Sequence, residues 1–168
     1  AVFVGGAGKL HVITASTGLD RYPASALTGA PAVPPAPLLI DGLVLVHNGL
    51  STFVHGYDLA TGARKWAYNV FNATSGPLVA HPDLGVVVAA TVDGFVDAML
   101  YKTGQRLWSN GVKGRPVFTA AGTLIMSDSS DSGGGVMALD AYTGPRHWRP
   151  STGIQGGPHP VAHRRPQG

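Results

Sequence analysis

An acidic, glycine-rich stretch at residues 127–135 carries the side chains of this sequence that best suit metal chemistry. The order Ser-Asp-Ser-Ser-Asp-Ser-Gly-Gly-Gly sets Asp128 and Asp131 on a flexible turn, and carboxylate oxygens on such a turn suit a hard cation such as calcium. The stretch lacks the closing glutamate and the spacing of an EF-hand loop. An ordinary connection between strands is therefore favoured, with calcium binding as the alternative.

Two other groups of residues suggest a ligand but lack its full pattern. His47 and His55 flank one predicted hairpin loop and could meet in space, yet a metal site needs further ligands that the sequence does not identify. Residues 5–9, Gly-Gly-Ala-Gly-Lys, have the glycines and lysine of a phosphate loop. They lack its four-residue spacer and join two predicted strands instead of opening a helix. We expect a turn there, and we assign no catalytic residue and no metal ligand.

Composition narrows the possible functions. The 168 residues include no cysteine, which excludes disulfides, thiolate nucleophiles and cysteine-based zinc sites. Charged residues make up 12% of the chain and the net charge is +3, with no basic stripe interleaved with aromatic residues, so a nucleic-acid partner is not expected. No apolar stretch approaches the roughly 18 to 20 residues of a membrane span.

A motif that recurs four times predicts the secondary structure that would position any site. Four times a Thr-Gly pair is followed, four residues after the glycine, by a large aromatic ring, and every Trp of the chain is used in this way. We interpret these residues as structural anchors of a repeat: Gly18 with Tyr22, Gly62 with Trp66, Gly104 with Trp108, and Gly144 with Trp148. The glycines recur at intervals of 44, 42 and 40 residues, the length of one propeller blade or one helical solenoid unit.

The local pattern favours strands over helices. A short apolar, β-prone run precedes each Thr-Gly pair, and glycine takes the positive φ of a tight turn at no steric cost. A second mark, a proline opening an apolar run, recurs at Pro37, Pro77, Pro116 and Pro160, and proline in a sheet opens a strand or lies on its edge. The repeat is therefore four short strands, beginning at the proline and ending at the ring, which predicts an all-β propeller of four-stranded antiparallel blades.

About four blades are expected, as a single propeller unit over residues 1–163 with turn motifs at 17–22, 61–66, 103–108 and 143–148. Residues 22–36 form a Pro-rich insert loop, and residues 164–168 form a tail outside the repeat. Four blades are half of a seven- or eight-bladed ring or a small closed ring. A piece of a longer chain is favoured; the alternatives are two copies that complete a ring, or a strand at residues 160–163 that closes a four-bladed one.

The residues around two of these turns carry a family resemblance. Segments 57–66 (Tyr-Asp-Leu-Ala-Thr-Gly-Ala-Arg-Lys-Trp) and 138–148 closely resemble the tryptophan-docking repeat of the pyrroloquinoline-quinone-like, quinoprotein-type β-propellers. Residues 2–6, residues 76–79 and the Asp93-Gly94 turn are similar to the rest of that repeat. The resemblance is specific for the fold and implies an extracytoplasmic or periplasmic location. It is less informative about function, because the same blades serve enzymes and scaffolds.

Two functions remain open, and a non-catalytic one is favoured. Resemblance to the scaffold members of the family implies a protein-interaction module without a cofactor, whose partners are other protein chains or the rest of its own parent chain. The alternative is the propeller of a quinone-dependent alcohol dehydrogenase of the polyvinyl-alcohol-dehydrogenase-like type, with pyrroloquinoline quinone and calcium. Such an enzyme needs a base carboxylate and a calcium shell, whereas Asp58 and Asp140 occupy equivalent places in their repeats and look structural.

Overall fold

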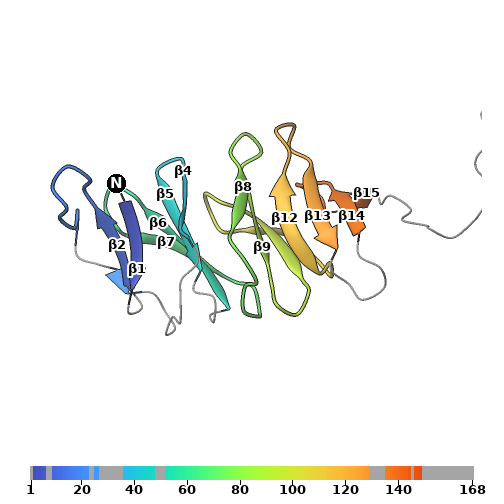
Figure 1. Cartoon of the computed structure of the whole chain (residues 1–168), viewed down its shortest axis with the longest axis horizontal. Helices are drawn as coiled ribbons and strands as arrows, with labels where there is room; N and C mark the ends of the chain where they lie inside the picture. Colours follow the sequence, from blue (N-terminus) through green and yellow to red (C-terminus); the bar gives the residue numbers. More distant parts are fainter. Residues whose placement is uncertain are drawn as a thin grey trace, which may run out of the picture.

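Four antiparallel sheets stand side by side in sequence order in the computed structural model of the chain (Figure 1). The structure describes residues 2–6, 9–22, 25–26, 36–47, 52–128, 135–144 and 146–148. Each strand pairs with the next one along the chain, so every sheet is a simple meander. The prediction of an all-β, propeller-type fold is confirmed.

The strands are as follows. The first sheet holds β1 (Val2–Gly6), β2 (Lys9–Ile13) and β3 (Ser25–Ala26); the second holds β4 (Leu38–Ile40), β5 (Leu43–His47), β6 (Phe53–Asp58) and β7 (Arg64–Asn69); the third holds β8 (Val79–His81), β9 (Val86–Ala90), β10 (Val96–Leu100) and β11 (Arg106–Asn110); the fourth holds β12 (Gly114–Phe118), β13 (Leu124–Asp128), β14 (Gly135–Leu139) and β15 (Arg146–Trp148).

The strand boundaries differ from the predicted ones in two respects. In the second and third sheets the last strand continues past the ring. β7 extends three residues beyond Trp66, because the backbone there still pairs with β6 as far as Phe53↔Asn69. Within the predicted Pro-rich insert, Ser25 and Ala26 pair with β2 as β3, while residues 27–35 lie outside the described ones. Residues 160–168, with the predicted closing strand and tail, also lie outside them.

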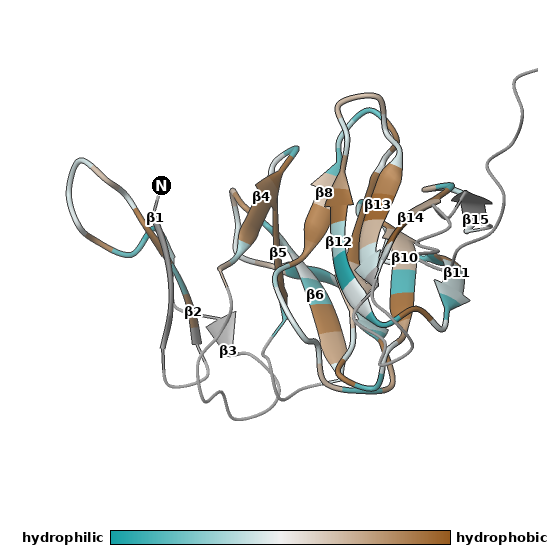
Figure 2. Cartoon of the chain, turned by 45° about the vertical axis from the view of Figure 1, so that its right-hand side comes forward, coloured by the Kyte–Doolittle hydropathy of each residue, from teal (hydrophilic) through white to brown (hydrophobic). Residues whose placement is uncertain are grey.

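The hydrophobic core lies between the sheets. β5 and β9 are buried at all five positions, because successive side chains of a strand point to opposite faces and both faces are covered by neighbouring sheets. One cluster joins the third and fourth sheets, a second joins the second and third, and a smaller one joins the first and second. Figure 2 shows the corresponding hydrophobic strands, with β4, β8 and β13 coloured mostly brown.

The two ends of the sheets carry different connections. One end, which we call the turn end, carries the Thr-Gly turns, such as the one between β10 and β11. The other, which we call the hairpin end, carries the connection between β9 and β10 at residues 91–95 and the links from one sheet to the next. Within the described ranges, no helix has the length and apolarity needed to cross a bilayer.

Candidate functional site

Three of the four predicted anchor rings lie against the turn of the next sheet, not that of their own. Trp66 of β7 lies against Gly104 in the third sheet, where a Cβ built on this glycine would stand only 2.6 Å from Cε3 of the indole. The indole Nε1 donates a hydrogen bond to the carbonyl oxygen of Tyr101, at 2.9 Å. Because Gly104 has φ +72°, glycine is needed both for the turn and for the close approach of the ring.

The same contact recurs at the sheets on either side. Trp108 lies against Gly144 and donates from Nε1 to the carbonyl oxygen of Ala141, at 3.0 Å. Tyr22 lies against Gly62, where a Cβ built on the glycine would overlap the phenol ring. The hydroxyl oxygen of Tyr22 is buried and has no hydrogen-bond partner among the described residues.

The outermost members of the series are Gly18 and Trp148. A Cβ built on Gly18 has no described atom within 4 Å. Trp148 lies on β15 opposite Ala138, the position that corresponds to Trp108 opposite Ala98, but the structure does not describe its side chain.

The repeated aspartates stabilise turns. Oδ1 of Asp58 accepts hydrogen bonds from the backbone nitrogens of Ala60 and Thr61 and from the Thr61 hydroxyl, all at 3.0 Å. The hydrogen bond from Lys65, together with the bonds from the turn, lowers the pKa of the Asp58 carboxyl. Asp140 accepts the matching set at its own turn. Both carboxylates are therefore engaged by the turn, as the sequence pattern predicted for them.

The two histidines of the predicted hairpin are buried in neighbouring strands. His47 of β5 and His55 of β6 are each 2% exposed, and burial lowers the pKa of each to about 4. Nδ1 of His47 forms a hydrogen bond with the hydroxyl of Thr74. Among the described residues no group of three or more His, Cys, Asp or Glu side chains is placed to hold a metal ion.

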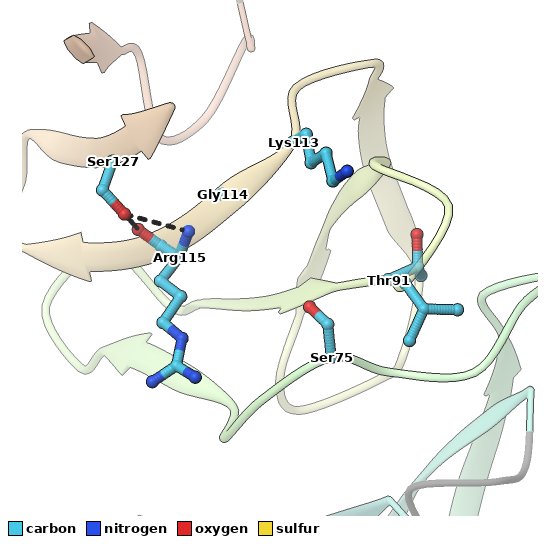
Figure 3. Close-up of a pocket in the computed structure, with 7 residues that line it drawn as sticks. Ser75, Thr91, Lys113, Gly114, Arg115 and Ser127 are labelled. Carbon is cyan, nitrogen blue, oxygen red and sulfur yellow. Dashed lines mark hydrogen bonds between the residues drawn. The ribbon is translucent and has the colours of Figure 1, made fainter. Parts of the chain in front are cut away.

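A cationic hollow of about 250 Å³ opens at the hairpin end between the third and fourth sheets. Lys113 and Arg115 lie at the start of β12 and are exposed, and Figure 3 shows both side chains on the rim with Ser75 and Thr91 across from them. Neither cation forms an ion pair with any other part of the chain that the structure describes. The backbone nitrogen of Arg115 donates a hydrogen bond to the hydroxyl oxygen of Ser127, and this hydroxyl donates to the carbonyl oxygen of Arg115.

A second hollow, of about 240 Å³, lies on the other side of the 91–95 connection. Phe71 and Phe95 line it, together with Asp97, which is 2% exposed. The Tyr68 hydroxyl donates to Oδ1 of Asp97 at 3.0 Å. Burial raises the pKa of Asp97, and burial and the Asp97 charge together raise the pKa of Tyr68 to about 12. Asp97 accepts its hydrogen bond within the protein. Asp93, which also lines the hollow, is exposed and accepts a hydrogen bond from the Thr91 hydroxyl. The hollow therefore offers a partner two phenylalanine rings beside one exposed carboxylate.

A contiguous surface joins the two hollows. We call it the hairpin surface and define it by five residues: Phe71, Val92, Phe95, Lys113 and Arg115. On one side of the 91–95 connection, the backbone nitrogen of Val92 donates to the carbonyl of Ala73 at 2.9 Å. On the other, a Cβ built on Gly94 would stand 3.2 Å from Cβ of Lys113.

The hairpin surface was not predicted from the sequence. Its residues come from three links that are far apart in the chain, and nothing in their local spacing marks them. The one available signal was their position between predicted strands at the same end of successive repeats.

The cationic hollow between the third and fourth sheets does not have the ligands that calcium prefers. The hollow between the third and fourth sheets is lined by hydroxyls, two cations and no carboxylate, whereas calcium requires several oxygen ligands that usually include carboxylates. Asp128 has no described side chain and Asp131 lies outside the described residues, so both the favoured strand connection at residues 127–135 and its calcium-binding alternative stay predictions.

The family follows from a sequence match that spans most of the chain. Residues 1–121, and again residues 26–150, match the family described as the outer membrane protein assembly factor BamB. The chain belongs to this family. The predicted resemblance to pyrroloquinoline-quinone-like propeller repeats is thereby confirmed. No curated protein sequence matches the chain.

Solved structures of BamB-type and related propellers share the fold. BamB from Moraxella catarrhalis is 21% identical, with a TM-score of 0.55 over 85% of this chain and 58% of that one. The quinohemoprotein alcohol dehydrogenase from Comamonas testosteroni is 25% identical, with a TM-score of 0.57 over 71% of this chain and 21% of that one. The computationally designed Ika8 protein is 18% identical, with a TM-score of 0.67 over 85% and 43%. The chain thus spans less than two thirds of each of these proteins.

Proposed function

We propose that this chain is a non-catalytic β-propeller module that binds another protein through the hairpin surface. The observation that carries the proposal is the exposure of large apolar side chains beside unpaired cations: Phe71 is 74% exposed, Val92 53% and Phe95 47%, next to Lys113 and Arg115. Aromatic residues and arginine are enriched in protein interfaces, and neighbouring apolar side chains left in water mark interaction sites.

The underlying structure supports such a role. The 91–95 connection is held on both sides, by the Ala73 carbonyl and by the Lys113 stem, so the exposed side chains stand on a fixed support. Binding to a fixed surface orders few additional groups and therefore costs less conformational entropy. The two cations favour a partner segment with carboxylates beside an apolar residue, because complementary charge steers association and selects the partner.

Site-specific photo-crosslinking in the source cell tests the proposal. A photoreactive phenylalanine analogue at Phe71 or Val92 of the parent protein is expected to give one discrete protein adduct, which the double change Lys113→Glu and Arg115→Glu abolishes. The same analogue at Leu19 or Tyr142, which are 69% and 52% exposed at the turn end, is the matched control. Equal adducts from both ends, or adducts that charge reversal leaves unchanged, would overturn the proposal.

The dehydrogenase alternative has its own readout. Pyrroloquinoline quinone with calcium, added to the purified protein, is expected to leave the absorbance spectrum of the quinone and the melting temperature unchanged. A spectral shift with a higher melting temperature would instead favour the enzyme.

An extracytoplasmic location is part of the same proposal. Its support is the description of the matching family as an outer membrane protein assembly factor. Fractionation of cells that make the parent protein is expected to recover it outside the cytoplasm, and recovery with a cytoplasmic marker would contradict this.

A further inference from the structure

A buried carboxylate lines the hollow of about 240 Å³ beside the 91–95 connection. It belongs to Asp97, which is 2% exposed. The Tyr68 hydroxyl donates to its Oδ1 at 3.0 Å, and Ser109 also hydrogen bonds to it, but neither brings a positive charge. Arg106 has a favourable charge interaction with Asp97, yet no cation in the part of the chain that the structure describes forms an ion pair with it. Because a paired cation offsets the cost of burying a charge, and a carboxylate has about four acceptor sites, Asp97 has the capacity to bind one.

An acid at this position is not a feature of the repeat. Asp97 stands seven residues before the glycine of its turn, and the residues at the same place in the other three sheets are His11, His55 and Met137. The fold therefore does not need a carboxylate here. Burial also raises the pKa of Asp97, because a charge is less stable away from water. A group that the repeat does not require and that is costly to bury points to a role in binding.

Two exposed aromatic rings line the same hollow. Phe71 is 74% exposed and Phe95 is 47% exposed. Phe71 has φ +63°, a left-handed backbone that bulky side chains rarely adopt, and its backbone nitrogen donates to Oδ1 of Asn69 at 2.8 Å. The chain thus holds an unfavourable conformation while the ring that it carries remains largely in water. Backbone strain of this kind concentrates at functional sites.

Asp93 and Ser109 complete the polar lining of the hollow, and both are exposed. Hydrogen bonds, first of all the one from the Thr91 hydroxyl, lower the pKa of Asp93, so this carboxylate is ionised at neutral pH. The hollow therefore places two carboxylates and a hydroxyl beside two aromatic rings. Carboxylates form charge-assisted hydrogen bonds with guanidinium and ammonium groups, and aromatic rings attract the same cations.

We propose that this hollow binds the basic side chain of a partner protein, and an arginine in preference to a lysine. A planar guanidinium stacks on an aromatic ring while its N–H groups donate to a carboxylate, whereas an ammonium is a compact, strongly hydrated charge. The inference rests on the proposed function, because Phe71 and Phe95 belong to the hairpin surface. It gives the partner two charges: a carboxylate for Lys113 and Arg115 and, on the other side of the 91–95 connection, a guanidinium for the hollow.

Fluorine NMR of the purified protein with para-fluorophenylalanine at position 71 tests the binding chemistry. N-acetyl-arginine methylamide, a blocked arginine with one positive charge, is expected to shift the fluorine signal in a saturable manner. The citrulline counterpart, which has the same shape and no charge, is expected to bind at least about tenfold more weakly, and blocked lysine at least about twofold more weakly. The absence of a saturable shift, or equal affinity for arginine and citrulline, would overturn the inference. Equal affinity for lysine would overturn the preference for arginine.

Asp97→Asn tests the buried carboxylate. It removes the charge but keeps an oxygen that accepts from Tyr68, and it is expected to weaken arginine binding at least about tenfold. Asp83→Asn removes an exposed charge from the connection between β8 and β9 and is the matched control, with an expected change of less than about twofold. Equal effects of the two variants would contradict the inference. If Asp97→Asn does not fold, Phe95→Leu decides, since loss of the exposed ring is expected to weaken binding at least about threefold and an unchanged affinity counts against the site.

Photo-crosslinking in the source cell separates this inference from the proposed function. With the photoreactive analogue at Val92, Asp97→Asn is expected to lower the yield of the discrete adduct at least about threefold, whereas Asp83→Asn is expected to leave it unchanged. An adduct that persists undiminished in Asp97→Asn overturns the inference and leaves the proposed function standing, whether or not blocked arginine binds. The absence of any adduct overturns the proposed function and with it the partner assigned to the hollow.

Discussion

The indole of Trp66 packs against the Cα of Gly104, in the space that a side chain at position 104 would occupy. The indole packs on the glycine of the next sheet and donates its N–H to Tyr101, three residues before that glycine. One contact therefore joins two sheets through both apolar packing and a directed hydrogen bond. Because each ring follows its glycine by four residues, the same sheet carries both a glycine turn that accepts the preceding ring and a ring that contacts the next glycine turn.

Replacement of Gly104 by alanine tests the steric part of this contact. The new Cβ would stand 2.6 Å from Trp66 and adopt φ +72°, so we expect the free energy of unfolding to fall by about 3 kcal/mol or more, from strain and ring displacement together. Gly85→Ala, with the same kind of φ and open space, should cost only about 1 to 2 kcal/mol. Urea denaturation of both variants measures the difference, and equal losses would mean that the ring adapts freely.

Truncation of Trp108 tests how much one ring contributes. It is 9% exposed and belongs to the cluster that joins the third and fourth sheets, so Trp108→Ala is expected to cost about 3 to 5 kcal/mol. Trp108→Phe keeps most of the apolar surface but leaves the Ala141 carbonyl without its donor. We expect this variant to lower the free energy of unfolding by about 1 to 3 kcal/mol. Thermal and urea unfolding provide both values. Similar losses for the two variants would show that the hydrogen bond, not the packing, dominates.

A tryptophan in place of Tyr22 is expected to stabilise the protein. The buried Tyr22 hydroxyl has no described partner. Trp66 and Trp108 each donate to the carbonyl three residues before the glycine they contact. At the Gly62 turn that carbonyl belongs to Leu59, so an indole at position 22 would have an acceptor. Removing an unsatisfied polar group and adding a hydrogen bond should raise the free energy of unfolding by roughly 1 kcal/mol, seen as a melting temperature higher by a few degrees. A lower melting temperature would show that the Gly62 turn cannot accept the larger ring.

Stability is expected to depend on pH through His47 and His55. Burial lowers both pKa values from 6.5 to about 4, so the unfolded chain binds more protons between these two values. The free energy of unfolding therefore has its full value above pH 6.5. It falls as the pH decreases towards 4, by roughly 2 to 3 kcal/mol per histidine. His47→Gln, which keeps an acceptor for Thr74, should weaken this dependence in urea unfolding at several pH values.

His11→Gln is the control for that measurement. His11 pairs with Asp20 at the surface, at 3.1 Å with a side chain that is 33% exposed, and its replacement should leave most of the dependence between pH 6.5 and 4 in place. A wild-type stability that is constant over this range would show that the two buried histidines are solvated.

Much of the fold was readable because its signals are local. A positive φ at Gly62 and Gly104 is a property of the turn itself, and the alternation of short apolar runs with turns depends only on neighbouring residues. The ends of β7 and β11 were wrongly predicted at the ring. β7 continues for as long as β6 provides partners, and the length of a partner strand is not a local signal.

The sequence by itself determined the repeat, the antiparallel strands and the pairing of a glycine turn with an aromatic ring, since each of these requires a fixed local spacing. Only the tertiary structure decided that Trp66 docks on the turn 38 residues further along and not on its own. It likewise decided that Phe71, Phe95 and Lys113 share one surface. The physical reason is that packing between sheets depends on how whole strands are stacked, and stacking brings together residues whose separation along the chain carries no periodic signal.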